Sequence, residues 1–227
     1  MKKILVVFAM NEEKKPIVDY FDKSSDWKHK EEDVYKYGDI VVKVASVGIG
    51  KVNSAYSVTK MLMLEDDFDF VINMGLAGGM LGNQKMGDIL IGEEYVQADF
   101  DLTAFGRAMG EVPGSEKCVS DDPFVCLLKK VIKEKGYSYE KGLMASGDVF
   151  LADKDRKKAI ENEFNPISFD MESAPIAEIC GKMEVPFVCL RVVSDNADES
   201  AADHFDLSIE QIVDRPVEIF LTAVERM

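Results

Sequence analysis

The chain has 227 residues, 47% of them hydrophobic and 30% charged, an ordinary composition for a globular protein that argues against a disordered chain. Its formal net charge of -15 makes a nucleic-acid backbone or an anionic membrane surface an unsuitable partner. Four cysteines without a CxxC pair and only two histidines argue against a disulfide framework and a zinc site, so we expect a cytoplasmic protein.

The first half of the chain alternates between strand-like and helix-like segments. Two lysines before the first apolar run resemble the start of a secretory signal, but the run is short and has no cleavage pattern, which favours a buried strand. The long stretch 87–100 mixes alternation with apolar runs and predicts a strand that bends or pairs at an edge. The pattern predicts strands over 3–10, 39–50, 68–75 and 87–100, and helices over 12–21, with Pro16 in the first turn, and over 51–65.

The second half continues the alternation to the end of the chain. An amphipathic helix over 122–136 has Asp121 or Asp122 as its cap and Gly136 beyond its end. We expect the final helix, over 208–227, to be kinked at Pro216. Between them, the pattern predicts strands over 139–148, 166–173 and 186–195, and helices over 153–164 and 174–183.

This alternation predicts an α/β protein, because near-continuous apolar strands are typical of a largely parallel sheet with helices on both faces. There is no internal repeat and no linker-like segment, so we expect a single domain over 1–227. No apolar run is long enough to span a bilayer as a helix.

The carboxyl ends of the strands are where such sheets bind ligands. These ends are rich in carboxylates and small residues, and neither histidine lies at one of them, which argues against a nucleophile with an adjacent base. The glycine-containing "GIGKV" matches neither a dinucleotide fingerprint nor a phosphate-binding loop, and tight turns explain most of its glycines. The residues at the strand ends are 9–13, 48–50, 75–79, 146–148, 170–172 and 194–195.

Three carboxylates and one arginine stand out among these residues. Glu13 and Glu172 each start a helix, where an acid is favoured by the helix dipole alone. Asp195 could serve as a turn former after its strand. Arg191 lies inside an apolar strand, and a buried guanidinium needs an acidic partner. Together they predict an acid–base site at one end of one sheet.

Several motifs in order resemble one known family. They are "FAMNEE", "VGIGKVNSA", "NMGLAGG", "GDILI", "FDLTAFG" with "VPG", "SGDVF", "FDMESAPIA" and "LRVVSDNAD", and they run from Lys2 to about Phe205. In order and spacing they resemble the 5'-methylthioadenosine/S-adenosylhomocysteine nucleosidases of the purine nucleoside phosphorylase-like superfamily. The pair "DMES" and "RVVSDNAD" is the most specific element.

The resemblance implies a three-layer α/β/α sandwich with a mixed, largely parallel central sheet. It also implies a homodimer that hydrolyses the N-glycosidic bond of 5'-methylthioadenosine and S-adenosylhomocysteine, with 5'-deoxyadenosine as a further candidate substrate. No metal and no cofactor is implied, because acid-assisted departure of adenine and a carboxylate-positioned water suffice for the chemistry.

The resemblance also assigns expected roles to particular residues. Asp195 would be the general acid, held by Ser194, and Glu13 would stay ionised and activate the water beside Arg191. Glu172 would bind the ribose hydroxyls with Met171 packed on the sugar, Phe150 would stack on the base, and the backbone of Leu151 would read its edge. The remaining expected binding residues are Ala9, Met10, Ile49, Leu76, Ala77, Gly78, Ala197 and Phe205 in the cavity, Leu102, Phe105 and Pro113 reaching across a dimer interface, and Arg107 in the outer pocket.

Three positions depart from the family pattern. Leu76 replaces a common serine and removes a hydroxyl close to the expected catalytic groups. Arg107 stands where an aromatic residue is common, and a cation there would favour a substrate with an anionic 5' tail. Asp170 replaces a common glutamate on the ribose side.

Three other functions stay open at this point. A phosphorolytic purine nucleoside phosphorylase needs cations or donor-rich loops near the sugar, and Arg191 is the one evident candidate at the strand ends. Hydrolysis of another purine-type nucleoside, such as a futalosine, is left open by Leu76 and Arg107. A nucleoside-binding protein that has lost catalysis is disfavoured by the presence of Glu13, Glu172 and Asp195.

Overall fold

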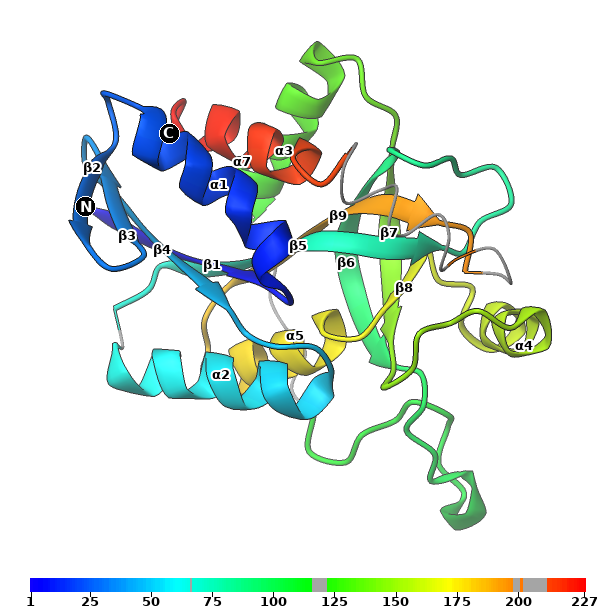
Figure 1. Cartoon of the computed structure of the whole chain (residues 1–227). Helices are drawn as coiled ribbons and strands as arrows, with labels where there is room; N and C mark the ends of the chain where they lie inside the picture. The colour runs from blue at the N-terminus through cyan, green and yellow to red at the C-terminus, as the bar shows by residue number, and fades with distance from the viewer. Residues whose placement is uncertain (66, 116–121, 198–200, 202–211) are drawn as a thin grey trace.

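The computed structural model describes residues 1–65, 67–115, 122–197, 201 and 212–227, which form one sheet with helices packed against it (Figure 1). Its strands, in these residues, are β1 (Lys2–Phe8), β2 (Lys28–Glu31), β3 (Val34–Tyr37), β4 (Ile40–Ser46), β5 (Phe70–Gly79), β6 (Ile89–Gln97), β7 (Tyr139–Ser146), β8 (Ser168–Asp170) and β9 (Phe187–Asp195). The helices are α1 (Asn11–Lys23), α2 (Lys51–Leu64), η1 (Thr103–Phe105), α3 (Asp122–Glu134), α4 (Lys154–Phe164), α5 (Ser173–Lys182) and α7 (Arg215–Val224).

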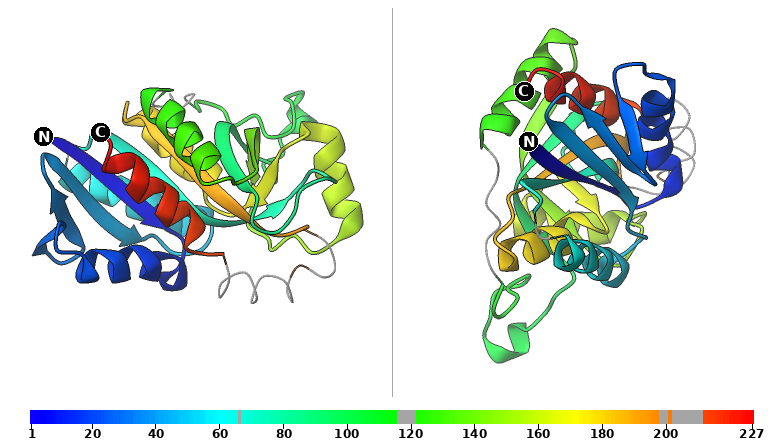
Figure 2. Two further views of the ribbon diagram at one scale, coloured as in Figure 1. Left: turned by 90° about the horizontal axis from the view of Figure 1, so that it is seen from above. Right: turned by 90° about the vertical axis from the view of Figure 1, so that its left-hand side faces the viewer.

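Helices cover both faces of the sheet, as the expected three-layer architecture requires. On one face α1, α3 and α7 enclose a core that includes Phe21, Phe124 and Phe220 (Figures 1 and 2). On the other face α2 and α5 bury Val58 and Ile176 against the strands. The three-layer prediction is therefore confirmed.

The sheet is mixed, with the order β2-β3-β4-β1-β5-β8-β7-β6-β9. Parallel pairs join β1 to β4 and β5, β5 to β9, and β7 to β6 and β8. Antiparallel pairs join β2 to β3, β3 to β4, β5 to β8, and β6 to β9. Because β5 also pairs with β9, the last five strands in the order close into a ring. The carboxyl ends of β5 and β9 therefore lie side by side.

Some predicted element details differ from the structure. Strand β6 pairs on both sides, so it is not an edge strand, and a register irregularity between Gly92 and Glu94 provides the predicted bend. Helix α1 begins at Asn11, which places Pro16 in its second turn rather than its first. Helix α7 begins at Arg215, so Pro216 does not kink a longer helix but lies in the first turn, where its missing N–H costs nothing.

Two further differences concern the predicted strands and the cap of α3. The predicted strand over 166–173 is shorter in the structure and ends at Asp170, where its side chain begins to accept hydrogen bonds from the next turn. The β2–β3 hairpin was not predicted, because β2 is exposed and charged and shows no apolar alternation. Residue 121, one of the two predicted caps of α3, lies outside the described residues, and Gly136 follows the helix with a left-handed φ of 72°.

Candidate active site

One cavity of about 300 Å³ opens at the carboxyl ends of β1, β5, β7, β8 and β9, which is large enough for a small ligand. Segments far apart in the sequence meet there, because the ring of strands brings their ends together. Most of the predicted site residues line this cavity, namely Ala9, Met10, Glu13, Ile49, Leu76, Ala77, Gly78, Phe150, Leu151, Met171, Glu172, Ser194, Asp195 and Ala197. Val149, Phe169 and Asp170 line it as well.

Glu13 is held in the cavity wall by backbone groups. Its Oε2 accepts hydrogen bonds from the N–H groups of Ala9 at 3.1 Å and Met10 at 3.2 Å, and its Oε1 accepts one from Leu76 at 2.9 Å. Burial raises the pKa of Glu13, while the charge of Arg191 and these three donors act against that rise. The hydrogen bonds thus match an ionised carboxylate, and the position of the group is fixed on two strand ends.

Arg191 is fully buried beneath the cavity and lies directly opposite Gly75 in the β5–β9 pairing. Gly75 has a φ of 153°, and a Cβ at this position would lie 2.4 Å from Glu13 Oε1 and 2.6 Å from Arg191 Nη1. The absence of a side chain at Gly75 therefore leaves the space that the Glu13 carboxylate and the Arg191 guanidinium occupy. Arg191 Nη1 is buried and makes no hydrogen bond within the described residues.

Asp170 is the main acidic partner of this arginine. Its Oδ2 lies 3.2 Å from Arg191 Nε, and its Oδ1 accepts hydrogen bonds from Ser146 Oγ at 2.6 Å and from the N–H groups of Glu172 and Ser173. Burial alone would lower the pKa of Arg191, but the nearby carboxylates, first of all Asp170, raise it. Asp170 therefore holds both the arginine and the backbone turn that presents Glu172.

Glu172 reaches from that turn to the start of α2. Its Oε1 accepts a hydrogen bond from the N–H of Gly50 at 2.9 Å, and its Oε2 lies 3.5 Å from Arg191 Nη2. Gly50 has a φ of 92°, a conformation that favours glycine, and its missing side chain leaves room for Asp148. Burial raises the pKa of Glu172 to about 7, and the negative charge of Asp170 adds to the rise while Arg191 opposes it.

Asp195 ends β9 next to a break in the strand register. Ala77 pairs with Val193 and Gly78 with Asp195, so Ser194 is an extra residue in β9, which is the signature of a β-bulge. In a regular strand the side chains of residues 194 and 195 would point to opposite faces, whereas here both line the cavity. Asp195 Oδ2 accepts a hydrogen bond from Ser194 Oγ at 2.5 Å.

Neighbouring residues complete the walls. Phe150 and Leu151 follow β7, and Phe169 belongs to β8 immediately before Asp170. Val149 and Phe169 were not predicted as site residues. Their position in the sequence, next to Phe150 and Asp170, could have indicated that they line the cavity, because residues that adjoin a strand end lie at the same edge of the sheet.

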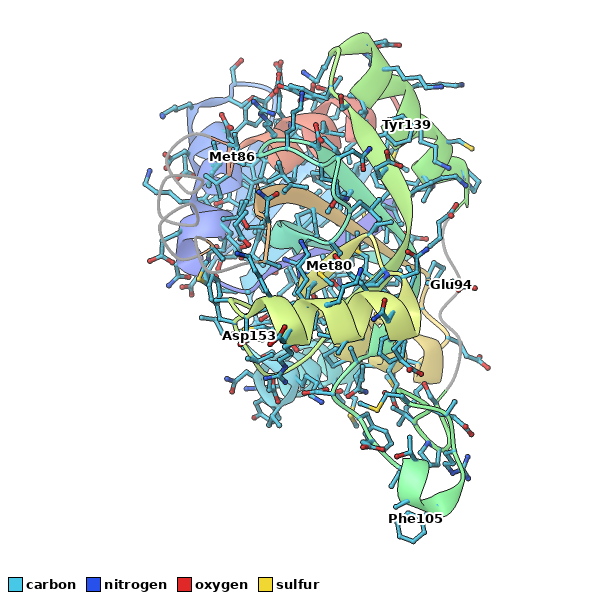
Figure 3. All side chains as sticks on the ribbon, turned by 90° about the vertical axis from the view of Figure 1, so that its right-hand side faces the viewer. Met80, Met86, Glu94, Phe105, Tyr139 and Asp153 are labelled. Atoms are coloured by element: carbon cyan, nitrogen blue, oxygen red, sulfur yellow. The ribbon has the colours of Figure 1, made fainter. Side chains whose placement is uncertain are left out.

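The predicted residues of the 102–113 segment lie elsewhere. Leu102, Phe105, Arg107 and Pro113 do not line the cavity of their own chain, since the segment that carries them projects from the body of the molecule (Figures 1 and 2). Phe105 lies at its tip with 82% of its surface exposed (Figure 3). Arg107 pairs with Glu111 on the same segment. Phe205 lies outside the described residues.

The titratable side chains that line the cavity are all acidic. Within the described part of the chain, its lining includes Glu13, Asp170, Glu172 and Asp195 but no lysine, arginine or histidine. In the described part of the chain, no group of three or more histidine, cysteine, aspartate or glutamate side chains is arranged so that it could hold a metal ion. No helix among the described residues is long and apolar enough to cross a membrane. The arrangement can exchange protons and accept hydrogen bonds from hydroxyl groups.

Comparison with known proteins gives concordant results. A family model described as "Phosphorylase superfamily" matches residues 3–225. The chain is 35% identical over 221 residues to an aminodeoxyfutalosine nucleosidase of Helicobacter pylori strain J99, covering 93% of each chain. It is 38% identical over 185 residues to a 5'-methylthioadenosine/S-adenosylhomocysteine nucleosidase of Geobacillus kaustophilus, covering 79% of this chain and 77% of the relative. A crystal structure of a mutant Helicobacter pylori MTAN with 5'-methylthioadenosine in the active site matches with a TM-score of 0.90, 31% identity and full coverage of both chains.

Proposed function

Because the chain belongs to the phosphorylase superfamily and its relatives are nucleosidases, we propose that it hydrolyses 5'-methylthioadenosine and S-adenosylhomocysteine to adenine and the 5'-substituted ribose. The protein is an N-glycosyl hydrolase. The observation that carries the proposal is the convergence of Glu13, Glu172 and Asp195, from three distant segments, around one cavity. 5'-Deoxyadenosine, which shares the base and the sugar, is a further candidate substrate.

Asp195 is the proposed general acid. Breaking the bond between C1' of the ribose and N9 of adenine leaves negative charge on the base, which a proton from Asp195 to N7 neutralises. Ser194 orients the carboxyl group through its hydrogen bond to Oδ2. Phe150, half exposed at the cavity mouth, is the proposed stacking partner of the base, with Leu151 at the edge of the base.

Glu13 is the proposed ligand of the attacking water, with Arg191 close by to order it. Glu13 lines the cavity, so its carboxylate can accept a hydrogen bond from the water, while the charge of the buried Arg191 on the other side of the Gly75 position helps to hold that carboxylate. The water oxygen bonds to C1' as the bond to adenine breaks, and Glu13 takes the proton. Leu76 contributes its backbone N–H to Glu13, so the loss of the family's serine hydroxyl leaves this contact intact.

Glu172 is the proposed ribose ligand. Its carboxylate accepts hydrogen bonds from sugar hydroxyls, and Met171 packs on the sugar face. The remaining lining residues, Ala9, Met10, Ile49, Ala77, Gly78 and Ala197, supply small apolar contacts, and we expect Phe205 to add to them.

Phosphorolysis is disfavoured by the occupancy of the α2 N-terminus. Helix N-termini bind phosphate through free N–H groups, but here Glu172 occupies the N–H of Gly50 and Asp148 occupies that of Lys51 at 2.8 Å. The acidic lining of the cavity adds repulsion for a phosphate. Water is therefore the proposed nucleophile.

A homodimer is the proposed working form, with the whole chain acting as one nucleosidase domain in the cytoplasm. The exposed Phe105 supports this idea, because a large apolar side chain at the tip of a projecting segment suits burial against a second copy. In such a dimer Leu102, Phe105 and Pro113 would cover the 5' substituent bound to the partner, and Arg107 would lie near its outer end.

A second candidate activity is hydrolysis of aminodeoxyfutalosine. It is favoured by the match to the Helicobacter pylori nucleosidase of that name over 93% of both chains. The same acid, water and ribose contacts would serve, because the bond that breaks is again an N-glycosidic bond.

The test is to incubate purified protein with methylthioadenosine, S-adenosylhomocysteine or aminodeoxyfutalosine, each with and without phosphate, and to measure the released base. Release that does not depend on phosphate is expected. Release that requires phosphate would identify a phosphorylase instead, and tight binding without release would identify a nucleoside-binding protein. The relative kcat/KM values rank the substrates.

A further inference from the structure

The backbone turn after β9 is held in a conformation that its residue type disfavours. Ala197 is buried and has a φ of 49°, in the left-handed region where a Cβ is crowded by the backbone. Its N–H donates a hydrogen bond to Asp195 Oδ1 at 2.7 Å. The orientation of the Asn196–Ala197 peptide group thus fixes one oxygen of the proposed general acid.

The other end of the same peptide group is held by a lysine from α4. Lys157 Nζ donates to the carbonyl oxygen of Asn196 at 2.6 Å and to that of Gly79, at the end of β5, at 3.2 Å. Its side chain is 16% exposed, and within the described residues it also forms a 3.9 Å ion pair with Glu161. Helix α4 itself is anchored by Ile160, which packs in one cluster with Met80 and Ala197.

We propose that Lys157 is a positioning residue that acts on Asp195 through the single peptide group between Asn196 and Ala197. A trans peptide is planar, with its C=O and N–H pointing in opposite directions, so fixing the carbonyl toward Lys157 fixes the N–H toward Asp195. An ammonium donor also makes a strong hydrogen bond and polarises the peptide, which strengthens the donor at its other end.

The left-handed φ of Ala197 explains why such a restraint is needed. Rotating this peptide group would let Ala197 relax to an ordinary φ and would remove the N–H from Asp195. Lys157 opposes that rotation, because the rotated carbonyl would leave a nearly buried ammonium group without this acceptor. The inference rests on the proposed function, in which Asp195 is the acid.

The test compares Lys157→Met with Lys158→Met in the adenine-release assay. Lys158 is the matched control, because it lies on the same helix, is 68% exposed and pairs only with Glu161 in the described structure. We expect Lys157→Met to lower kcat by about tenfold or more while KM and the melting temperature stay nearly constant. Lys157→Arg, which retains charged donors, is expected to recover part of the activity, and Lys158→Met is expected to behave like the wild type.

A double-mutant cycle with Ala197→Gly separates positioning from a structural role. Glycine adopts a positive φ without strain, so the double variant should need the lysine less. We expect Ala197→Gly to raise kcat roughly fivefold to tenfold more in the Lys157→Met background than it does in the wild-type background. Additive effects in the cycle, or an unchanged kcat in Lys157→Met, would overturn the inference. Failure of the wild-type protein to release any base would instead refute the proposed function.

Discussion

The inner end of the cavity and the projecting 102–113 segment differ in how far their side chains are buried and held by their own chain. At the inner end, Glu13, Glu172 and Asp195 are buried and each accepts hydrogen bonds from fixed backbone or side-chain donors. The projecting segment carries Phe105 almost fully exposed and packs little of its apolar surface on its own chain. The groups proposed to carry out the chemistry are thus fixed within one chain, whereas the groups proposed to contact the 5' substituent require a second copy.

This difference separates two kinds of variant. Changes at the inner end should reduce kcat for every substrate, because they alter the proposed acid, the proposed water site or the proposed sugar contact. Changes on the projecting segment should alter KM, and only for substrates with a 5' substituent long enough to reach it.

The largest effect is expected from Asp195→Asn. The amide keeps an oxygen for the Ala197 N–H and can donate to Ser194 Oγ, so the fold should be retained while the transferable proton is lost. We expect kcat for adenine release to fall by about 10³-fold with an unchanged melting temperature. Asp19→Asn, on the outer surface of α1, is the control. Near-normal turnover in Asp195→Asn would refute the acid role.

Gly75→Ala should disturb the inner end through sterics alone. The added methyl group would overlap Glu13 Oε1 and Arg191 Nη1, so we expect kcat to fall by about 100-fold and the free energy of unfolding to drop by about 1–3 kcal/mol. Gly82→Ala is the matched control, because a Cβ there meets nothing within 4 Å. The measurements are steady-state kinetics and urea denaturation. Equal behaviour of the two variants would contradict the packing described at Gly75.

Glu172→Gln tests the electrostatics of the inner end. Burial raises the pKa of Glu172 from 4.5 to about 7, so the folded protein binds a proton more tightly than the unfolded chain. This stabilisation is fully present below about pH 4.5 and is lost as the pH rises through about 7. Glutamine cannot ionise, so the free energy of unfolding of the variant should lack this dependence on pH, which amounts to at most about 3 kcal/mol. Denaturation at pH 5 and pH 8 measures it, and an unchanged slope would contradict the assignment.

The smallest effect is expected from Phe105→Ala. Because this side chain is exposed in the single chain, its removal should not lower the stability of the monomer fold. In the proposed dimer, KM for methylthioadenosine should rise by about tenfold while kcat stays constant, since about 1–3 kcal/mol of apolar contact is lost. The effect should be weaker for 5'-deoxyadenosine. Equal KM changes for both substrates would break the division between the two regions.

The site residues that could be predicted from the sequence are charged groups at the ends of apolar strands. Burying a charge costs free energy unless the charge is paired, so a charged residue beside an apolar strand indicates a site. These residues are Glu13, Glu172, Asp195 and Arg191. The motif resemblance then extended the set to small lining residues such as Ala9 and Gly78. The prediction that the site's acids pair with Arg191 is confirmed for Glu172, and Asp170 proves to be its main partner.

Other features depend on contacts that local patterns do not contain. The bulge at Ser194 arises from the register between β5 and β9, and a single strand carries no signal for it. The ring formed by β5 and β9 is likewise a tertiary event. The sequence pattern predicts a kink at Pro216, because a proline inside a helical pattern usually disrupts the helix, but the described helix starts one residue earlier.

The facing of Gly75 and Arg191 across two strands has a consequence for substitution patterns. The space that the arginine needs exists only while position 75 lacks a Cβ, and that space becomes a void once the arginine is replaced by a shorter side chain. Each position therefore constrains what the other can accept. Relatives that have exchanged the arginine for a small neutral residue should show larger residues at 75. Restoring the arginine in such a relative, while the larger residue at 75 is kept, should not give a correctly packed site.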